Sequence, residues 1–308
     1  MTLLPLTHIK KNQAIVYLIL ANVIWGATSP IMKWSVENIN LYVFLFIRFF
    51  IASFLFLPLA NNNLHIAKKD YGIVLAVSLS GGALTVTLLL MGLSHTASIN
   101  APVIGASGPI FLLIFASFLF HEKLRQKTII GTLVSLLGVL IIVFQPTPLE
   151  QTKGFFQGNI MLLLSTLSGV IHIFLLKKLI NKYSLFSLNF WTSMISALSL
   201  MPFALYATYQ NGFLPDIGPA GFFGLFYTIV FSSAIAFTIF AIGISKMKVN
   251  ETGIFAYVAP FSAILVAVPL LGEKVTPLYL IGGLFIFLGI SIVQMRIKFH
   301  PFHSIKHT

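Results

Sequence analysis

Charged residues are scarce in this sequence, and cysteine is absent. Asp, Glu, Lys and Arg make up 8% of the 308 residues, and Asp and Glu together number only 7. A soluble domain carries about 25% charged residues, so lipid rather than water must surround most of this surface. Because there is no cysteine, disulfide bonds and thiolate chemistry are excluded.

The sequence also lacks the motifs of metal and carboxylate catalysis. It contains no His-Glu-x-x-His, and it offers no pair of intramembrane aspartates, since Asp70 and Asp216 both fall in expected loops. We therefore expect no bound metal, no cofactor and no enzymatic activity. The net charge is +12, but the excess sits in short loops without a long basic run, which argues against a nucleic-acid partner.

Hydrophobic residues are abundant, at 57% of the chain, and gather in segments near the length of a spanning helix. About 20 apolar residues cross the hydrocarbon core, and these runs are too long and continuous for barrel strands. The first run, from Ala14 to Trp34, exceeds the roughly 7–15 apolar residues of a signal peptide and is expected to be retained. We predict helices at residues 14–34, 41–60, 71–93, 97–120, 128–145, 157–177, 185–207, 219–242, 251–271 and 277–297.

Lys and Arg are distributed unevenly between the two sides of these helices. Fifteen lie in the termini and loops of one side, and three, Lys33, Lys153 and Lys274, lie in the loops of the other. Arg48 lies within the second helix. Positively charged loops stay in the cytoplasm, so both termini are predicted to be cytoplasmic.

The two halves of the chain repeat each other at a distance of 151 residues. Residues 91–143 align with residues 242–294 without a gap, and 13 of the 53 positions are identical. Six identities are apolar matches that any two membrane helices share. The others are Gly92/Gly243, Ser94/Ser245, Pro109/Pro260, Glu122/Glu273, Lys123/Lys274, Gly131/Gly282 and Gly138/Gly289.

Each half contains five predicted helices, so the second half enters the membrane from the opposite side. The predicted fold is therefore an all-α integral membrane protein with ten transmembrane helices in two inverted five-helix repeats. The first repeat is assigned to residues 1–147 and the second to residues 148–308. Internal repeats of this kind are typical of transporters, whose substrate sites lie near the membrane midplane between the repeats.

Several motifs resemble a known family. The first helix reads Ala-Asn-Val-Ile-Trp-Gly-Ala-Thr over residues 21–28, and the second carries Arg48-Phe49. The helices with Pro109 and Pro260 end in Glu-Lys at the same spacing. This pattern is similar to the EamA family of the drug/metabolite transporter superfamily. The resemblance implies a multi-pass exporter of amino acids or related small metabolites in the bacterial inner membrane, acting by alternating access.

Pro109 and Pro260 occupy equivalent places in two predicted helices. Proline removes a backbone hydrogen bond and kinks a helix, and the freed carbonyls must face protein or a cavity. The symmetric placement favours kinks that flex as a central cavity opens. A static kink for packing is the alternative.

Arg48 and His172 are titratable groups that have no counterpart in the other half. Arg48 lies about 10 Å of helical rise from the outer end of its helix, where a charge is costly and marks a candidate site. It either pairs with a substrate carboxylate or locks its helix in place. His172 can change charge near neutral pH, so it is a candidate for proton coupling, ahead of Glu251, which also suits a helix cap.

Polar and aromatic side chains recur on several predicted helices. Aromatic walls with a few polar groups suit a small amphipathic ligand, although small polar residues also join membrane helices. The candidates for substrate binding are Asn22, Trp25, Thr28, Arg48, Thr85, Ser107, His172, Tyr227, Ser232 and Tyr257.

Three alternatives to an amino-acid transporter stay open. A multidrug exporter would need a buried acid, and a carrier of nucleotide sugars or lipid-linked sugars would want basic residues in the cavity. The segment Gly105-Ala106-Ser107-Gly108 is similar to a motif of intramembrane serine proteases, with His172 as the base. Ten helices and an inverted repeat do not fit that enzyme. The expected partners are a small-molecule substrate and the lipid bilayer, and a monomer is plausible.

Overall fold

The structure is a computed structural model of the whole chain. It describes residues 11–37, 39–60, 63–108, 110–112, 114–115, 126–145, 152–180, 182–211, 217–245, 255 and 258–294. All regular elements in these ranges are helical. Large apolar side chains such as Leu133, Tyr209 and Leu265 are 57–77% exposed, as expected of a surface that faces lipid. The prediction of an all-helical membrane protein is therefore confirmed.

The helices lie where the hydrophobic runs predicted them. In the first half they are α1 (Lys11–Ser35), α2 (Leu41–Leu59), η2 (Lys68–Asp70), α3 (Tyr71–Ser78), η3 (Leu79–Leu84), α4 (Thr85–Leu93), α5 (Asn100–Gly105) and α7 (Gln126–Val143). In the second half they are α8 (Thr152–Leu176), α9 (Leu185–Asn211), α10 (Gly218–Phe226), η5 (Tyr227–Ile235), α11 (Ala236–Ser245), α13 (Val258–Leu271) and α14 (Pro277–Gln294).

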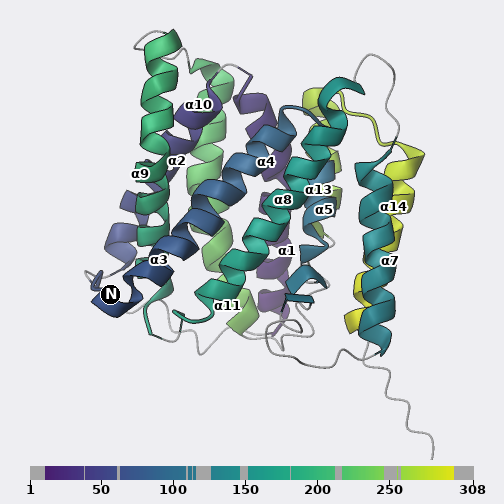
Figure 1. Cartoon of the computed structure of the whole chain (residues 1–308), viewed down its shortest axis with the longest axis horizontal. Coiled ribbons are helices and arrows are strands. Elements are labelled where there is room, and N and C mark those ends of the chain that lie inside the picture. Colours follow the sequence, from purple (N-terminus) through teal and green to yellow (C-terminus); the bar gives the residue numbers. More distant parts are fainter. Residues whose placement is uncertain are drawn as a thin grey trace, which may run out of the picture.

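Some predicted helices are continuous spans and others are described only in part. Within the described ranges, seven helices are long and apolar enough to cross a membrane, and Val258–Leu271 and Pro277–Val293 are shorter apolar helices. Successive helices run in opposite directions between two ends of the molecule (Figure 1). We call these the Glu273 end, at the top of Figure 1, and the Lys68 end, at the bottom.

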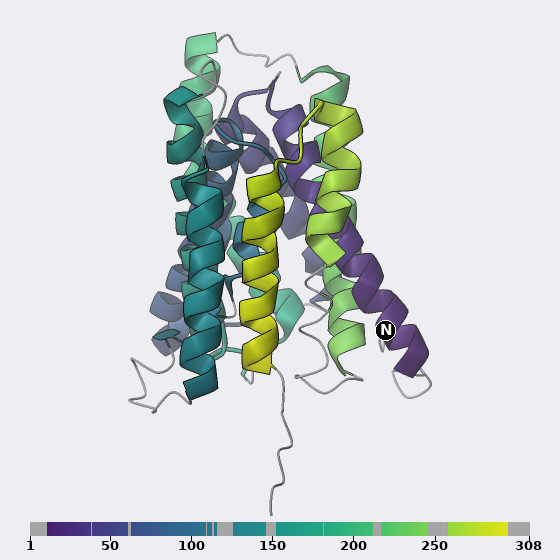
Figure 2. The same cartoon turned by 90° about the vertical axis from the view of Figure 1, so that its right-hand side faces the viewer.

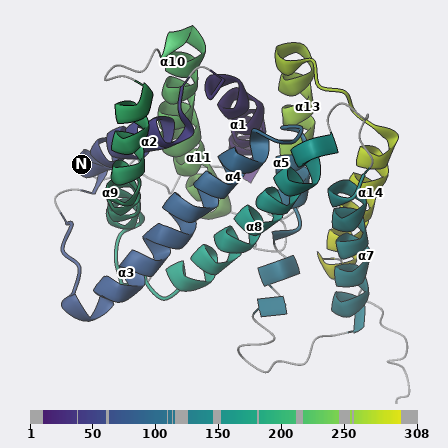
Figure 3. The ribbon, with the colours of Figure 1, turned by 45° about the horizontal axis from the view of Figure 1, so that its top comes forward.

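The first helix of each half packs against the opposite half. Helix α1 contacts α10, η5, α11 and α13, whereas α8 contacts α3, η3, α4 and α5. Figure 3 shows α8 running beside the continuous α3–α4 rod. The pairs α2–α9 and α7–α14 also join the halves, and Figure 2 shows α7 and α14 side by side. Exchanging the two halves maps each of these contacts onto another contact of the set.

Repeated glycines bring α7 and α14 into backbone contact. A Cβ atom at Gly289 would lie 2.4 Å from the carbonyl oxygen of Gly131, and one at Gly138 would lie 2.4 Å from that of Gly282. Gly131 matches Gly282 in the repeat and Gly138 matches Gly289, so the two contacts are equivalent under exchange of the halves. Small residues drive such packing in lipid because they allow close backbone approach.

A second pair of repeated glycines makes equivalent contacts elsewhere. A Cβ atom at Gly92 in α4 would lie 2.8 Å from a methyl carbon of Leu162 in α8. One at Gly243 in α11 would lie 2.6 Å from the branch carbon of Leu18 in α1. Leu18 and Leu162 are separated by 144 residues, so α1 and α8 correspond to each other at this spacing.

Two helices contain π-helical segments at equivalent positions. These are η3 and η5, and residues 79–84 shifted by 151 positions become residues 230–235, inside η5. A π segment widens the helix and shifts its hydrogen bonding, which is common at functional sites. Both segments contact the opposite half, because η3 touches α8 and α9 and η5 touches α1 and α2.

The glycine contacts predict a position-specific loss of stability. We expect Gly289→Ala to destabilise the protein by about 1–3 kcal/mol, the usual cost of overpacking, because its new methyl group meets the backbone of α7. Gly283→Ala is the matched control in the same helix, since its Cβ atom would meet only a Val103 methyl group, at 3.9 Å. Thermal unfolding of both variants in one detergent tests this, and equal midpoints would contradict it.

Candidate functional site

Four of the predicted site residues meet where α1 crosses the π segment η5. The Trp25 indole N–H donates to the carbonyl oxygen of Ser232 over 3.2 Å. The hydroxyls of Thr28 and Ser232 lie 3.2 Å apart, and the Tyr227 hydroxyl donates to the carbonyl oxygen of Ile24 over 2.8 Å. The structure therefore brings Trp25, Thr28, Tyr227 and Ser232 together at an interface between the two halves.

Aromatic rings surround this contact. The Trp25 ring packs edge-on against Phe237 and at a tilt against Phe240, with centroids 5.4 and 4.9 Å apart. Tyr227 stacks on Phe231 at 5.5 Å. Aromatic walls around a few polar groups are what an amphipathic ligand requires.

The equivalent place in the other half is built around His172. Its Nδ1 lies 2.9 Å from the carbonyl oxygen of Val77 in α3, and a Cβ atom at Gly81 would lie 2.0 Å from the same nitrogen. His172 is 144 residues from Thr28, and Gly81 is 151 residues from Ser232. His172 against Gly81 therefore corresponds to Thr28 against Ser232.

Serine and threonine hydroxyls complete this second contact. Ser168 of α8 donates to the carbonyl oxygen of Ser80 over 2.8 Å, and Ser165 donates to that of Thr85 over 2.7 Å. The Thr85 hydroxyl donates to the Ser80 carbonyl, five residues earlier, over 2.6 Å. Thr85 thus lies at the α8 contact, and its hydroxyl bonds to its own π segment.

Arg48 is a buried cation without a carboxylate partner. One guanidinium nitrogen lies 3.5 Å from the Met32 sulfur of α1, and the buried Nε has no hydrogen-bond partner. The guanidinium carbon lies 5.5 Å from the centre of the Phe49 ring. Within the described ranges, no Asp or Glu lies within ion-pair distance of it. Burying an uncompensated charge is costly, so the site is primed for an anionic group.

Two other predicted site residues bond within their own helices or turns. The Asn22 amide donates to the Leu18 carbonyl over 2.8 Å. The Ser107 hydroxyl donates to the Ile104 carbonyl over 2.5 Å, whereas His172 Nδ1 is paired with Val77. Ser107 therefore lacks the hydrogen bond to an imidazole that a serine nucleophile needs.

The remaining candidates lie at or beyond the edge of the described chain. Pro109, Glu251 and Tyr257 lie outside the described residues. Pro260 is the third residue of α13 as described, in the first turn, where proline is tolerated. The kink prediction is therefore untested. Among the described residues, no group of three or more His, Asp or Glu could hold a metal ion.

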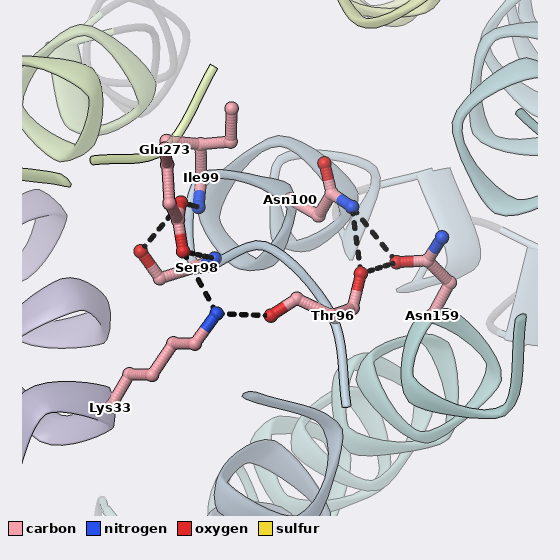
Figure 4. A network of polar contacts seen from close by, with 7 residues as sticks. All are labelled: Lys33, Thr96, Ser98, Ile99, Asn100, Asn159 and Glu273. Carbon is pink, nitrogen blue, oxygen red and sulfur yellow. Dashed lines mark hydrogen bonds and ion pairs between the residues drawn. The ribbon is translucent and has the colours of Figure 1, made fainter. Parts of the chain in front are cut away.

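A polar network centred on Glu273 joins the two halves at one end of the molecule (Figure 4). The Lys33 ammonium of α1 lies 3.0 Å from one Glu273 carboxylate oxygen and donates to the Thr96 carbonyl over 2.7 Å. The backbone N–H groups of Ser98 and Ile99 donate to the same carboxylate over 2.7 and 3.2 Å. The Ser98 hydroxyl adds a bond of 3.0 Å.

A second branch of this network reaches α8. The Thr96 hydroxyl donates to the Asn159 carbonyl oxygen over 2.7 Å, and the Asn100 amide donates to the same oxygen over 2.9 Å. The Asn159 amide in turn donates to the Ile142 carbonyl at the end of α7 over 3.1 Å. Helices α1, α5, α7 and α8 and the segment after α13 are thereby tied together at the Glu273 end.

Reasoning from sequence alone did not assign the Glu273 network to a site. Glu273 was distinguished only as a scarce carboxylate kept in both halves, and Asn100 was expected to cap a helix. In the structure Asn100 is fully buried and bonds to Thr96 and Asn159, while Glu273 binds the free N–H groups before α5. Recurrence in the repeat was the available signal.

Sequence comparison identifies the family to which this architecture belongs. The EamA-like transporter family matches twice along the chain, over residues 12–144 and 156–295. The chain belongs to the EamA-like transporter family. The predicted resemblance is confirmed, and the chain is a transporter rather than an enzyme. The intramembrane protease alternative is therefore wrong, in agreement with the separate hydrogen bonds of Ser107 and His172.

Curated relatives match nearly the whole chain. An uncharacterized transporter of Bacillus subtilis, YetK, is 26% identical over 94% of this chain and 89% of its own length. An uncharacterized transporter of Archaeoglobus fulgidus is 25% identical over 94% and 88%. A probable terminal-alkyne amino-acid exporter of Streptantibioticus cattleyicolor is 23% identical over 93% and 95%.

A solved structure supports the fold of this EamA-family chain. One crystal structure superimposes with a TM-score of 0.61 over 92% of this chain and 97% of its own, at 15% sequence identity. At this identity the likeness concerns the arrangement of helices alone.

The geometry predicts energetic coupling between Lys33 and Glu273. Their side chains are 25% and 8% exposed, so the pair is better shielded than surface pairs, which contribute about 0.2–1 kcal/mol. A cycle of Lys33→Met, Glu273→Gln and the double variant should give a coupling of about 1–3 kcal/mol, as for contacting residues in one network. Unfolding in nanodiscs measures it.

Lys274→Met is the control for this cycle, because Lys274 is an exposed neighbour whose removal should not couple to Lys33. A coupling between Lys33 and Glu273 no larger than the control value would show that the network is not held by this ion pair.

Proposed function

We propose that this EamA-family protein moves small amphipathic metabolites, amino acids foremost, across the bacterial inner membrane by alternating access. The observation that carries the proposal is the Glu273 network, which closes one end by contacts between the two halves. Such a closure must break whenever the site opens to that side. The midplane contacts of Trp25, Thr28 and His172 with the π segments would then line the substrate site.

The proposed topology is ten transmembrane helices in two inverted repeats, residues 1–147 and 148–308. Three findings support it: the family matches each half, α1 and α8 exchange partners between the halves, and repeated glycines make equivalent contacts. The Lys68 end, with Lys177, Lys178 and Lys182, would face the cytoplasm under the positive-inside rule. The Glu273 end would then face outward.

Charge in the interior favours an anionic or zwitterionic substrate. Arg48 is buried without a carboxylate partner, and the described acids, Glu37, Asp70 and Glu273, all lie at the ends of helices or in segments between them. A multidrug exporter of cations would need an acid near the midplane, so this alternative has less support. The related Streptantibioticus protein is a probable exporter of an amino acid, which agrees with a substrate that carries a carboxylate.

Arg48 provides the test of substrate class. In proteoliposome counterflow with a panel of amino acids, Arg48→Gln should weaken transport by about 10- to 100-fold, because a hydrogen bond to a charged group contributes about 1.5–3 kcal/mol. Arg48→Lys keeps the charge and should retain more activity. The corresponding amines, which lack the carboxylate, should respond little to either change.

Two results would contradict this assignment. Equal loss for amino acids and their amines would mean that Arg48 only holds α2 in place. Absence of transport for every amino acid by folded protein would rule out the amino-acid substrate.

His172 remains the proposed group for any proton coupling, ahead of Glu251, because it lies at the contact between α8 and η3. We expect weak coupling through α1, which offers Asn22 and no acid. His172→Gln should flatten the dependence of flux on pH, whereas His95→Gln, an exposed residue at the Glu273 end, should not. An unchanged pH profile in His172→Gln would remove His172 from this role.

A further inference from the structure

A cavity of about 580 Å³ lies at the Lys68 end, away from the α1–η5 contact and the Glu273 network. It is formed where residues 64–66 and the first turns of α3 face α9. Its walls are mostly apolar and include Leu64, Val74, Leu75 and Trp191, while His65 and Tyr71 add polar groups. Its volume lies within the range of about 300–1,000 Å³ that is common for small-molecule sites.

Hydrogen bonds to the second half hold the wall of this cavity in place. The Trp191 indole N–H donates to the Leu64 carbonyl over 2.9 Å. The backbone N–H of Ala67 donates to the Tyr183 hydroxyl over 3.1 Å. The segment between α2 and α3 is thereby fixed at both edges of the cavity, so the space is preformed.

Two lysines next to the cavity carry uncompensated positive charge. Lys68 and Lys69 form the turn η2 between the lining residues Ile66 and Tyr71, and both are exposed. The neighbouring Asp70 carboxylate does not neutralise them, because it pairs with Lys182 at 3.0 Å and accepts from the Tyr183 hydroxyl. Elsewhere in the described chain, neither Lys68 nor Lys69 has a carboxylate within ion-pair distance.

The cavity also opens onto the surface that faces lipid. Tyr71 and Leu75 are 57% and 48% exposed and lie one turn apart on α3. Gly72 lines the cavity between them, and a Cβ atom there would meet no heavy atom within 4 Å. An acyl chain can enter from this side without crossing a polar barrier.

We propose that this cavity binds an anionic phospholipid. The acyl chain fills the apolar space beside Trp191, and the phosphate lies beside Lys68 and Lys69, with His65 and Tyr71 at the level of the headgroup. Basic residues at the membrane surface attract anionic lipids by about 1 kcal/mol each. A zwitterionic lipid of the same chain length fits the cavity but gains little from the two lysines.

Trp191 reports occupancy directly. The chain has 3 tryptophans, so Trp25→Phe with Trp34→Phe leaves Trp191 as the single fluorophore. In nanodiscs of phosphatidylcholine, phosphatidylglycerol with brominated acyl chains should quench Trp191 at a much lower mole fraction than brominated phosphatidylcholine. The expected preference is about 30-fold, which corresponds to about 2 kcal/mol for two lysines.

Two substitutions in this background separate the headgroup from the cavity. Lys68→Gln with Lys69→Gln should remove the preference for phosphatidylglycerol but leave quenching by both lipids at high mole fraction. Gly72→Phe should fill the cavity and weaken quenching by both lipids, while Gly72→Ala should behave like the parent. Should Gly72→Phe fail to fold, Gly72→Leu serves the same purpose.

The outcomes that overturn the proposal are specific. Equal quenching by the two brominated lipids in the parent would exclude a site selective for anionic lipid. A preference that survives loss of both lysines would exclude them as the headgroup contact. Quenching that is unchanged in Gly72→Phe, or in Gly72→Leu if that variant stands in for it, would place the lipid outside the cavity.

Discussion

The closure at one end of this transporter depends on a single carboxylate. Glu273 receives the Lys33 ammonium, two backbone N–H groups and the Ser98 hydroxyl, so it satisfies a charge and several donors at once. An unpaired carboxylate or ammonium at this depth would cost far more than the pair does. The interaction is therefore strong while it is intact, and breaking it requires that water or another partner replace every bond. This all-or-none character suits a gate with two states.

The contacts elsewhere divide into a fixed frame and adaptable interfaces. Helices α7 and α14 meet through glycines, with backbone against backbone, and such packing leaves no room for sliding. Helices α1 and α8 instead contact the π segments through single hydroxyl, indole and imidazole groups. These few hydrogen bonds can be exchanged for bonds to a ligand at modest cost. The structure thus places replaceable contacts near the middle and rigid ones at the periphery.

Most of the fold could be predicted from the sequence, because each part rests on a local pattern. Apolar run length located the helices, and the repeated glycines marked contacts that the structure then showed. The Glu273 network could not be derived, since its partners Lys33 and Ser98 are distant in sequence and are brought together only by the exchange of α1. The π segments also had no signal in composition. Trp25, Thr28, Tyr227 and Ser232 were predicted individually, but their meeting depended on η5.

The central claim is that the Glu273 network is a gate that opens during transport. The absence of cysteine allows spin labels to be attached at Ser94→Cys and Lys274→Cys, two exposed positions at this end, for distance measurement by double electron–electron resonance. Addition of Glu273→Gln to this labelled protein should shift the distance distribution toward a longer, open population. An identical distribution with and without Glu273→Gln, in folded protein, would contradict the account.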